Sequence, residues 1–213
     1  MLKTFRLLDK AGELMKNSKR FEQSPASPGK VILFVGDSTV VGTGADIPEH
    51  SIAGRFGAQY PNAKIINRGI NGQKIHQLEA ELDPTKENKA DILVIQIGAN
   101  DILRFTPLFH IKRDLIKLLE KAFILSKTVV LLHSGRVGDA PFFPKAIGWL
   151  WNIKAAQVRR LYIKESKRTG ARYVDLFEAD LSYNDYAGDL VHPNENGYKI
   201  WFEKILSTIQ DQF

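Results

Sequence analysis

The chain contains no cysteine among its 213 residues. This excludes disulfide bonds, thiolate metal ligands and a cysteine nucleophile, so the fold depends on its hydrophobic core. A chain of this length suits one domain and buries roughly 70% of the surface that its unfolded form exposes. The hydrophobic share of 44% is that of an ordinary globular protein.

Metal-ligand pairs and long apolar runs are missing as well. The five histidines form neither an H-x-x-x-H nor an H-E-x-x-H pair, so we expect no metal. No stretch approaches the roughly 18 apolar residues of a membrane span, and the N-terminus lacks the apolar stretch of a signal peptide. These absences predict a cytoplasmic protein.

Charge of one sign is not concentrated in any segment. The net charge is +6, but acids and bases alternate, as in Lys112-Arg113-Asp114, which is typical of solvated helix faces. We therefore expect no nucleic-acid partner. Nucleotide fingerprints are incomplete too: Gly36 and Gly42 lack the Lys-Ser/Thr ending of a phosphate loop, and Gly42-Thr43-Gly44 lacks a third glycine. No cofactor is predicted.

Residues 1–30 are predicted to form an amphipathic helix and a linker, ahead of a main domain over residues 31–213. The helix has Leu2, Phe5, Leu8 and Met15 near one face, and the polar linker carries two prolines and a glycine. The first interpretation is a helix docked on the domain. The alternative is weak contact with a membrane surface.

From residue 31 onward, short apolar runs alternate with helical patterns. The predicted strands are Val31–Val35, Ala63–Ile66, Ile92–Ile97, Thr128–Leu132 and Arg172–Val174. The predicted helices are Ser51–Tyr60, Lys74–Leu82, Ile111–Leu125, Asn152–Thr169 and a final one around Tyr198–Ile209. This alternation predicts an α/β fold with a five-stranded parallel sheet covered on both faces. Sites in such sheets form beyond the carboxyl ends of the strands.

Four polar segments fall at or near that edge. Each alone has a structural interpretation, such as a helix cap, a turn or an internal aspartate–histidine contact. They are Gly36-Asp37-Ser38-Thr39, Asn67–Gly72, Gly98-Ala99-Asn100-Asp101 and Asp189-Leu190-Val191-His192-Pro193.

Together these segments supply the parts of a nucleophilic serine site. A nucleophilic serine needs a base, and the base needs an orienting group, which fits Ser38, His192 and Asp189. Proline after His192 holds that histidine extended and leaves one ring nitrogen free to face the serine. Donors for a developing oxyanion are expected from the N–H groups of Ser38 and Gly69 and from the Asn100 amide.

The same blocks, in this order and spacing, resemble the SGNH hydrolases, also called the GDSL esterase/lipase family. The resemblance implies a flavodoxin-like, three-layer α/β/α fold and ester hydrolysis without a metal. It also implies Ser38 as nucleophile, His192 as base, Asp189 as orienting group, and Ser38, Gly69 and Asn100 as oxyanion donors. One departure is Thr39, which stands where the family's first block has leucine. We interpret Asp37 and Asp101, which also fall in these blocks, as structural.

The predicted function is hydrolysis of small or medium acyl esters through an acyl-enzyme on Ser38, with thioesters and lysophospholipids included. The alternatives are a carbohydrate O-acetyl esterase and a catalytically silent binding module on the same scaffold. The complete set of five site residues argues against silence, since a binding module needs no such combination. The expected partner is therefore a small-molecule ester.

The segment Ser134–Trp151 follows the fourth strand at the presumed active edge. It carries Phe142, Phe143, Trp149 and Trp151 between prolines and a glycine. It is interpreted either as a loop that packs on its own domain or as a pocket wall or lid. His133 and Arg136 flank it and receive no predicted role.

Overall fold

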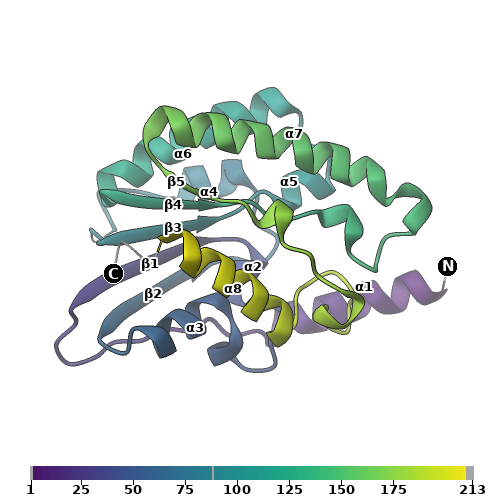
Figure 1. Ribbon diagram of the computed structural model, residues 1–213, viewed down its shortest axis with the longest axis horizontal. Helices are drawn as coiled ribbons and strands as arrows, with labels where there is room; N and C mark the ends of the chain where they lie inside the picture. Colours follow the sequence, from purple (N-terminus) through teal and green to yellow (C-terminus); the bar gives the residue numbers. More distant parts are fainter. Residues whose placement is uncertain (1, 88, 210–213) are drawn as a thin grey trace.

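The computed structural model describes residues 2–87 and 89–209, and it contains the predicted sheet. Five parallel strands are arranged in the order β2-β1-β3-β4-β5 (Figure 1). Their bounds are β1 Lys30–Gly36, β2 Ala63–Gly69, β3 Ile92–Gln96, β4 Thr128–Leu132 and β5 Arg172–Val174. Each predicted strand overlaps an observed one.

The strands are apolar throughout because both faces of the sheet are covered. Successive side chains of a strand point to opposite faces. On β1, Leu33 and Val35 belong to one core cluster, whereas Ile32 and Phe34 belong to the other. A continuous apolar run therefore supplies both cores, as is usual for parallel sheets.

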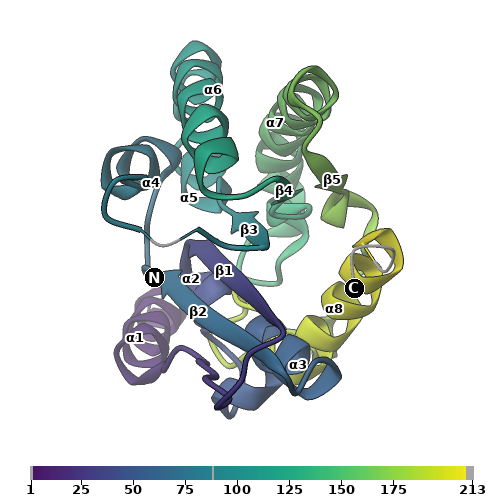
Figure 2. The same cartoon turned by 90° about the vertical axis from the view of Figure 1, so that its left-hand side faces the viewer.

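Two layers of helices cover the sheet, which confirms the three-layer α/β/α architecture (Figure 2). One face carries α4 (Ile75–Glu81), α6 (Leu108–Leu125) and α7 (Lys145–Thr169), and the other carries α3 (Ile52–Gln59) and α8 (Glu195–Ile209). The short helices α2 (Ser38–Val41) and α5 (Ala99–Leu103) follow β1 and β3 directly. They start the two segments that carry the predicted serine and asparagine.

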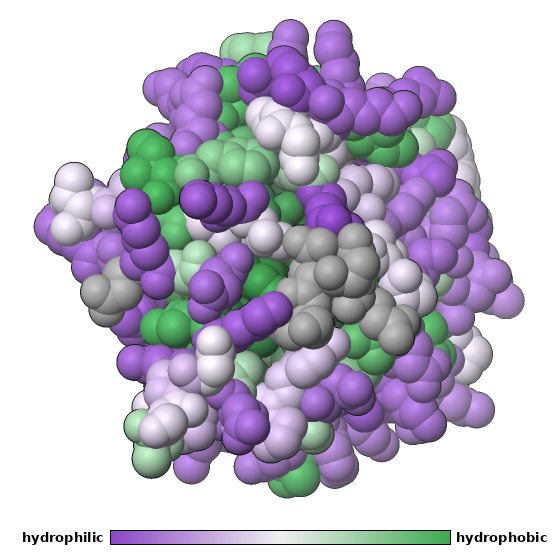
Figure 3. Space-filling view, turned by 60° about the vertical axis from the view of Figure 1, so that its left-hand side comes forward, coloured by the Kyte–Doolittle hydropathy of each residue, from purple (hydrophilic) through white to green (hydrophobic). Residues whose placement is uncertain are grey.

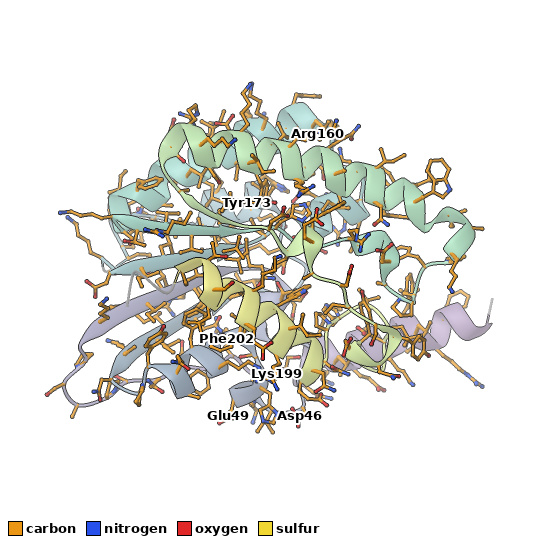
Figure 4. All side chains as sticks on the ribbon, in the orientation of Figure 1. Asp46, Glu49, Arg160, Tyr173, Lys199 and Phe202 are labelled. Atoms are coloured by element: carbon orange, nitrogen blue, oxygen red, sulfur yellow. The ribbon has the colours of Figure 1, made fainter. Side chains whose placement is uncertain are left out.

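Aromatic rings hold the layer formed by α3 and α8. Phe56 of α3 lies edge-on to Phe34 of β1 and to Phe202 of α8, with ring centroids 5.4 Å and 5.3 Å apart. Figure 4 labels Phe202 on α8. Edge-to-face pairs of this kind stabilise a core beyond the burial of their area. These contacts fix α8, the helix that follows His192, against the sheet.

Helix α7 begins at Lys145, seven residues before the predicted Asn152, and this corrects the sequence-based boundary. Pro144 and Gly148 suggested a loop, but a proline just before the first turn is compatible with a helix. A Cβ at Gly148 would lie 2.3 Å from the carbonyl oxygen of Gly138, so glycine lets the helix pack closely on the turn Val137–Asp139. The helix ends at Gly170 (φ 82°), as predicted.

The N-terminal helix α1 spans Leu2–Asn17, and an extended segment connects it to β1. Gln23 pairs with Ile65 in an antiparallel bridge, and its side-chain Nε2 donates to the carbonyl oxygen of Ala63 at 2.8 Å. This segment thus covers part of the edge strand β2. Phe5 is 63% exposed, and the side chain of Leu2 lies outside the described residues. Contact with a membrane surface stays a prediction.

The side of the molecule seen in Figure 3 is mainly hydrophilic, with hydrophobic residues scattered between polar ones. Scattered apolar residues are normal on a protein surface. Within residues 2–87 and 89–209, none of the helices has the length and apolar character to cross a membrane. The large apolar surfaces are instead found in the two core clusters.

Candidate active site

The end of β1 places Ser38 at the carboxyl edge of the sheet. Gly36 has a φ of 147°, and a Cβ there would lie 1.8 Å from the carbonyl oxygen of Gln96, so only glycine fits. Asp37 caps α2: its Oδ1 accepts from the N–H of Thr39 at 3.0 Å and from the Thr39 hydroxyl at 2.8 Å. The chain then turns sharply, and Ser38 starts α2 facing a cavity.

The structure brings Ser38, His192 and Asp189 into one hydrogen-bonded chain. The Ser38 Oγ lies 2.9 Å from His192 Nε2, and His192 Nδ1 lies 2.5 Å from Asp189 Oδ2. A carboxylate beside Nδ1 fixes the ring proton there, so Nε2 is free to accept the serine proton. Asp189 is fully buried, whereas the His192 side chain keeps 11% of its surface exposed toward the cavity.

The loop itself makes Asp189 an orienting group. Its Oδ1 accepts hydrogen bonds from the N–H groups of Val191 at 3.0 Å and His192 at 3.1 Å, while Leu190 adopts a positive φ of 62°. Burial would raise the pKa of Asp189, but the hydrogen bond and charge of His192, with these N–H groups, hold that pKa below its ordinary value. The carboxylate therefore stays ionised beside the imidazole.

Two predicted oxyanion donors meet at the same cavity. Asn100, at the start of α5, lines the cavity with Ser38, and its Nδ2 donates to the carbonyl oxygen of Gln73 at 3.1 Å. An amide nitrogen carries two hydrogens, so the second one remains available. Among the described residues, the N–H of Ser38 donates no hydrogen bond, because it stands at the first turn of α2.

Gly69 does not fit the role that the sequence suggested for it. Its N–H donates to Asn67 Oδ1 at 2.9 Å, and a Cβ there would press on the backbone of Val41. Gly72, three residues later, lines the cavity with Ser38 and Asn100 and adopts a φ of 76°. Within the described chain its N–H donates no hydrogen bond. The sequence alone did not distinguish Gly72 from Gly69, because one glycine ends β2 and the other follows it three residues later.

Asp37 and Asp101 hold the backbone of the site. Asp101 Oδ2 accepts from the N–H of Ile75 at 2.9 Å and so connects α5 to the start of α4, and burial raises its pKa. Burial raises the pKa of Asp37 to about 6, against the opposing hydrogen bonds from Thr39. Neither carboxylate lines the cavity, which agrees with the structural interpretation.

A cavity of about 280 Å³ opens at Ser38 and His192. Most of its lining is apolar, and it is contributed by α1, the segment 134–143, the segment 179–193 and α8. The apolar side chains are Leu8, Ala11, Met15, Ala99, Leu103, Val137, Ala140, Phe142, Phe143, Ala179, Leu181, Val191, Pro193 and Trp201. In the part of the chain that is described, no group of three or more His, Asp or Glu side chains is placed to hold a metal ion.

The segment Ser134–Trp151 contributes part of this wall. Phe142 and Phe143 line the cavity, whereas Trp149 is 55% exposed on the outer side of α7. Trp151 lies behind the wall and supports it, with its ring centroid 4.5 Å from that of Phe143. The pocket-wall interpretation therefore holds for the two phenylalanines, and no lid movement follows from it.

His133 takes no part in the cavity. It is fully buried after β4, where the N–H of Gly135 donates to Nδ1 at 3.0 Å and Nε2 lies 3.1 Å from the carbonyl oxygen of Ala155. Burial lowers the pKa of His133 to about 4, so the ring is neutral near pH 7.

Comparisons with known proteins agree with this fold. A family model, the GDSL-like lipase/acylhydrolase family, matches residues 34–200. A solved structure from Veillonella parvula, a member of the lipolytic protein G-D-S-L family, is 21% identical; the match covers 84% of this chain and 98% of that one, with a TM-score of 0.70. The structure of TesA is 19% identical, with 86% and 100% covered and a TM-score of 0.72.

The acetylxylan esterase Axe2 from Geobacillus stearothermophilus shares the fold as well. It is 22% identical, with 87% of this chain and 96% of that chain covered and a TM-score of 0.60. No curated protein matches the chain. Because the family model spans most of its length and the site residues stand in the expected order along the sheet edge, the chain belongs to the GDSL-like lipase/acylhydrolase family.

Proposed function

We propose that this ester-hydrolysing serine hydrolase cleaves small or medium acyl esters through an acyl-enzyme on Ser38. One observation carries the proposal: the hydrogen-bonded chain from Ser38 through His192 to Asp189 opens into an apolar cavity. A serine, a base and an orienting carboxylate within hydrogen-bond reach are the requirements of nucleophilic catalysis.

In the first half-reaction, Ser38 Oγ attacks the ester carbonyl carbon while its proton passes to His192 Nε2. The new imidazolium is stabilised by the Asp189 carboxylate, which is 2.5 Å from Nδ1. When the tetrahedral intermediate collapses, the bond to the alkoxide breaks and His192 returns the proton to the departing alcohol. The acyl group remains on Oγ.

The oxyanion of that intermediate needs preorganised donors. We assign the N–H of Ser38, the N–H of Gly72 and the free hydrogen of Asn100 Nδ2, since all three residues line the cavity. The assignment replaces Gly69 by Gly72, because the Gly69 N–H is already bound to Asn67. In the second half-reaction, His192 takes a proton from a water that attacks the acyl carbon. The bond between the acyl carbon and Oγ then breaks, His192 returns the proton to Oγ, and the acid leaves.

The size and lining of the cavity favour short or medium hydrocarbon chains. Small-molecule sites range over roughly 300–1,000 Å³, and the cavity of about 280 Å³ lies just below that range. The charged residues that line the cavity pair with one another: Arg136 forms ion pairs with Asp139, at 3.1 Å, and with Asp180. A neutral ester therefore suits the cavity better than an anionic one.

Active-site labelling tests the nucleophile. A p-nitrophenyl alkylphosphonate should release p-nitrophenolate and leave its phosphorus on Ser38 Oγ, as read by mass spectrometry of the labelled peptide. Ser134 is a matched control, because it lines the same cavity but donates its hydroxyl to the carbonyl oxygen of Ile97 at 3.0 Å. Ser38→Ala should abolish labelling and Ser134→Ala should retain it. A tag on any other residue overturns the assignment.

Substrate class requires a panel of esters. p-Nitrophenyl acetate, butyrate, octanoate and dodecanoate should separate short from long acyl chains, with acyl-thioesters and lysophospholipids alongside. Acetylated xylan enters the panel because Axe2, which shares the fold, is an acetylxylan esterase. Turnover of acetylated xylan above all simple esters would favour the carbohydrate esterase, and no turnover with any ester would favour a silent binding module.

A further inference from the structure

Helix α1 stands outside the matched family region, which begins at residue 34, yet it reaches the catalytic cavity. Leu8, Ala11 and Met15 line that cavity together with Ser38 and Asn100. The three side chains are spaced by three and four residues, so they share one face of the helix. Figure 1 shows α1 at the end of the molecule where α8 begins.

A polar contact fixes the C-terminal end of α1 beside the oxyanion region. Asn71 Nδ2 donates to the carbonyl oxygen of Met15 at 2.8 Å, and Asn71 Oδ1 accepts from the Thr43 hydroxyl at 2.8 Å. Asn71 directly precedes Gly72, and the N–H of Thr43 donates to the carbonyl oxygen of Ser38 at 3.0 Å. The helix is therefore positioned by the same loops that carry the nucleophile and its donors.

The lining face of α1 is apolar along its whole length, and its burial increases toward the reacting centre. Leu8 is 53% exposed, whereas Ala11 and Met15 are half-buried. None of the three side chains offers a hydrogen-bond donor, and a hydrocarbon chain is the part of an ester that gains from such a surface. Leu8 therefore marks the solvent end of the wall and Met15 the end nearest to Asn71.

We propose that Leu8, Ala11 and Met15 form the wall of the acyl subsite, so that the acyl chain lies along α1 and the helix sets the accepted chain length. This inference rests on the proposed acyl-enzyme at Ser38. It assigns to a segment outside the family region a specificity-determining role in the reaction. The neighbouring Lys10 is exposed and does not line the cavity.

The absence of cysteine gives a direct test in the full-length chain, because a single introduced thiol is unique. Ala11→Cys should react with a maleimide in the free enzyme. Attaching an n-octylphosphonyl group to Ser38 should slow that reaction roughly tenfold, since the alkyl chain covers the thiol, whereas a methylphosphonyl group should change it less than about twofold. Lys10→Cys is the matched control and should react at the same rate in all three states.

A second pair of variants tests the same subsite through kcat/KM for esters of different acyl length. Ala11→Trp should lower kcat/KM for the octanoate ester by roughly tenfold or more, the discrimination a hydrophobic pocket gives per methylene. The ratio of kcat/KM for the octanoate ester to that for the acetate ester should fall accordingly, while the methylphosphonate still attaches to Ser38. Lys10→Trp should leave the whole acyl-length profile unchanged.

The outcomes separate this inference from the proposed function. Failure of any phosphonate to attach to Ser38 would remove the acyl-enzyme itself. Attachment of the octylphosphonate with no protection of the thiol in Ala11→Cys, or an unchanged acyl-length profile in Ala11→Trp, would overturn the role of α1 and leave the esterase intact. A profile that shifts with the length of the alcohol rather than of the acyl group would also overturn the acyl assignment.

Discussion

Two regions at the carboxyl edge of the sheet each carry a histidine, and only one is built for catalysis. In the region after β4, backbone groups occupy both ring nitrogens of His133. In the loop before α8, His192 has a carboxylate on Nδ1 and a serine hydroxyl on Nε2. Both regions lie where a parallel sheet places its functional residues.

The comparison teaches that partners rather than position make a catalytic base. Protonation of His133 would create a buried cation that, among the described residues, has no carboxylate as a hydrogen-bond partner, and burial accordingly lowers its pKa to about 4. Protonation of His192 is supported by Asp189, which is fully buried and ionised. Of these two histidines, His192 is the one placed to take up and return a proton in the proposed mechanism.

Replacing His192 and His133 in turn should give the largest difference in kcat between the two regions. His192→Ala should lower kcat by a factor on the order of 10⁴–10⁶, the range found when one member of a serine triad is removed. His133→Gln should keep kcat within a few-fold and lower the melting temperature instead. Steady-state kinetics and thermal unfolding on the same preparations check both. A folded His133→Gln protein without activity would end the distinction between the two regions.

Two asparagines, Asn67 near the end of β2 and Asn100 just after β3, sharpen the comparison further. Asn100→Ala removes a proposed transition-state donor and should lower kcat by about 10²–10³, with KM within a few-fold. Asn67 is fully buried, where it donates to the carbonyl oxygen of Val40 and accepts from Gly69. Its change to alanine leaves those groups unpaired, at roughly 1–3 kcal/mol each.

Kinetics and melting temperature measured together separate these two roles. The Asn100 variant should lose turnover with little loss of stability, and the Asn67 variant should lose stability first. Near-normal kcat in Asn100→Ala, with a lowered melting temperature, would leave Asn100 as a cap of α5.

The sequence predicted the sheet, its two helical layers and the placement of the Ser38, His192 and Asp189 segments, because these depend on local patterns. Apolar runs mark the strands, and Asp-x-x-His-Pro encodes its own hydrogen bonds within one loop. The oxyanion glycine depends instead on which N–H stays unbound. Asn67 accepts from the Gly69 N–H only two residues away, but its side chain is held by the carbonyl oxygen of Val40, which is distant in the chain.

Two other features were out of reach for the same reason. The start of α7 depends on the close approach of Gly148 to Gly138, and hydrophobic periodicity in the sequence does not predict this contact. The contribution of α1 to the cavity depends on a contact between Asn71 and Met15, residues that are far apart in the chain. Both are set by packing between segments rather than by either segment alone.

The smallest expected effect is on how the free energy of unfolding changes with pH. His133 and Asp37 should change it in opposite directions. Burial lowers the pKa of His133 from 6.5 to about 4, so the unfolded chain binds the extra proton between these values. Stability from this group therefore rises with pH across that window. Burial raises the pKa of Asp37 from 3.8 to about 6, so here the folded state binds the extra proton and stability falls as pH rises.

The two buried groups should nearly cancel, because each shift corresponds to about 3 kcal/mol of opposite sign. Asp37→Asn keeps the acceptor for Thr39 and removes the falling contribution, so its stability should rise more steeply than wild type between about pH 4 and pH 7. His133→Gln removes the rising contribution, so its curve should be flatter than wild type or slope downward. Urea unfolding at several pH values measures both, and the double variant should return to the wild-type slope. Parallel curves for all four proteins would mean that neither group titrates differently in the folded state, and the contrast between a buried neutral His133 and a paired His192 would lose its electrostatic basis.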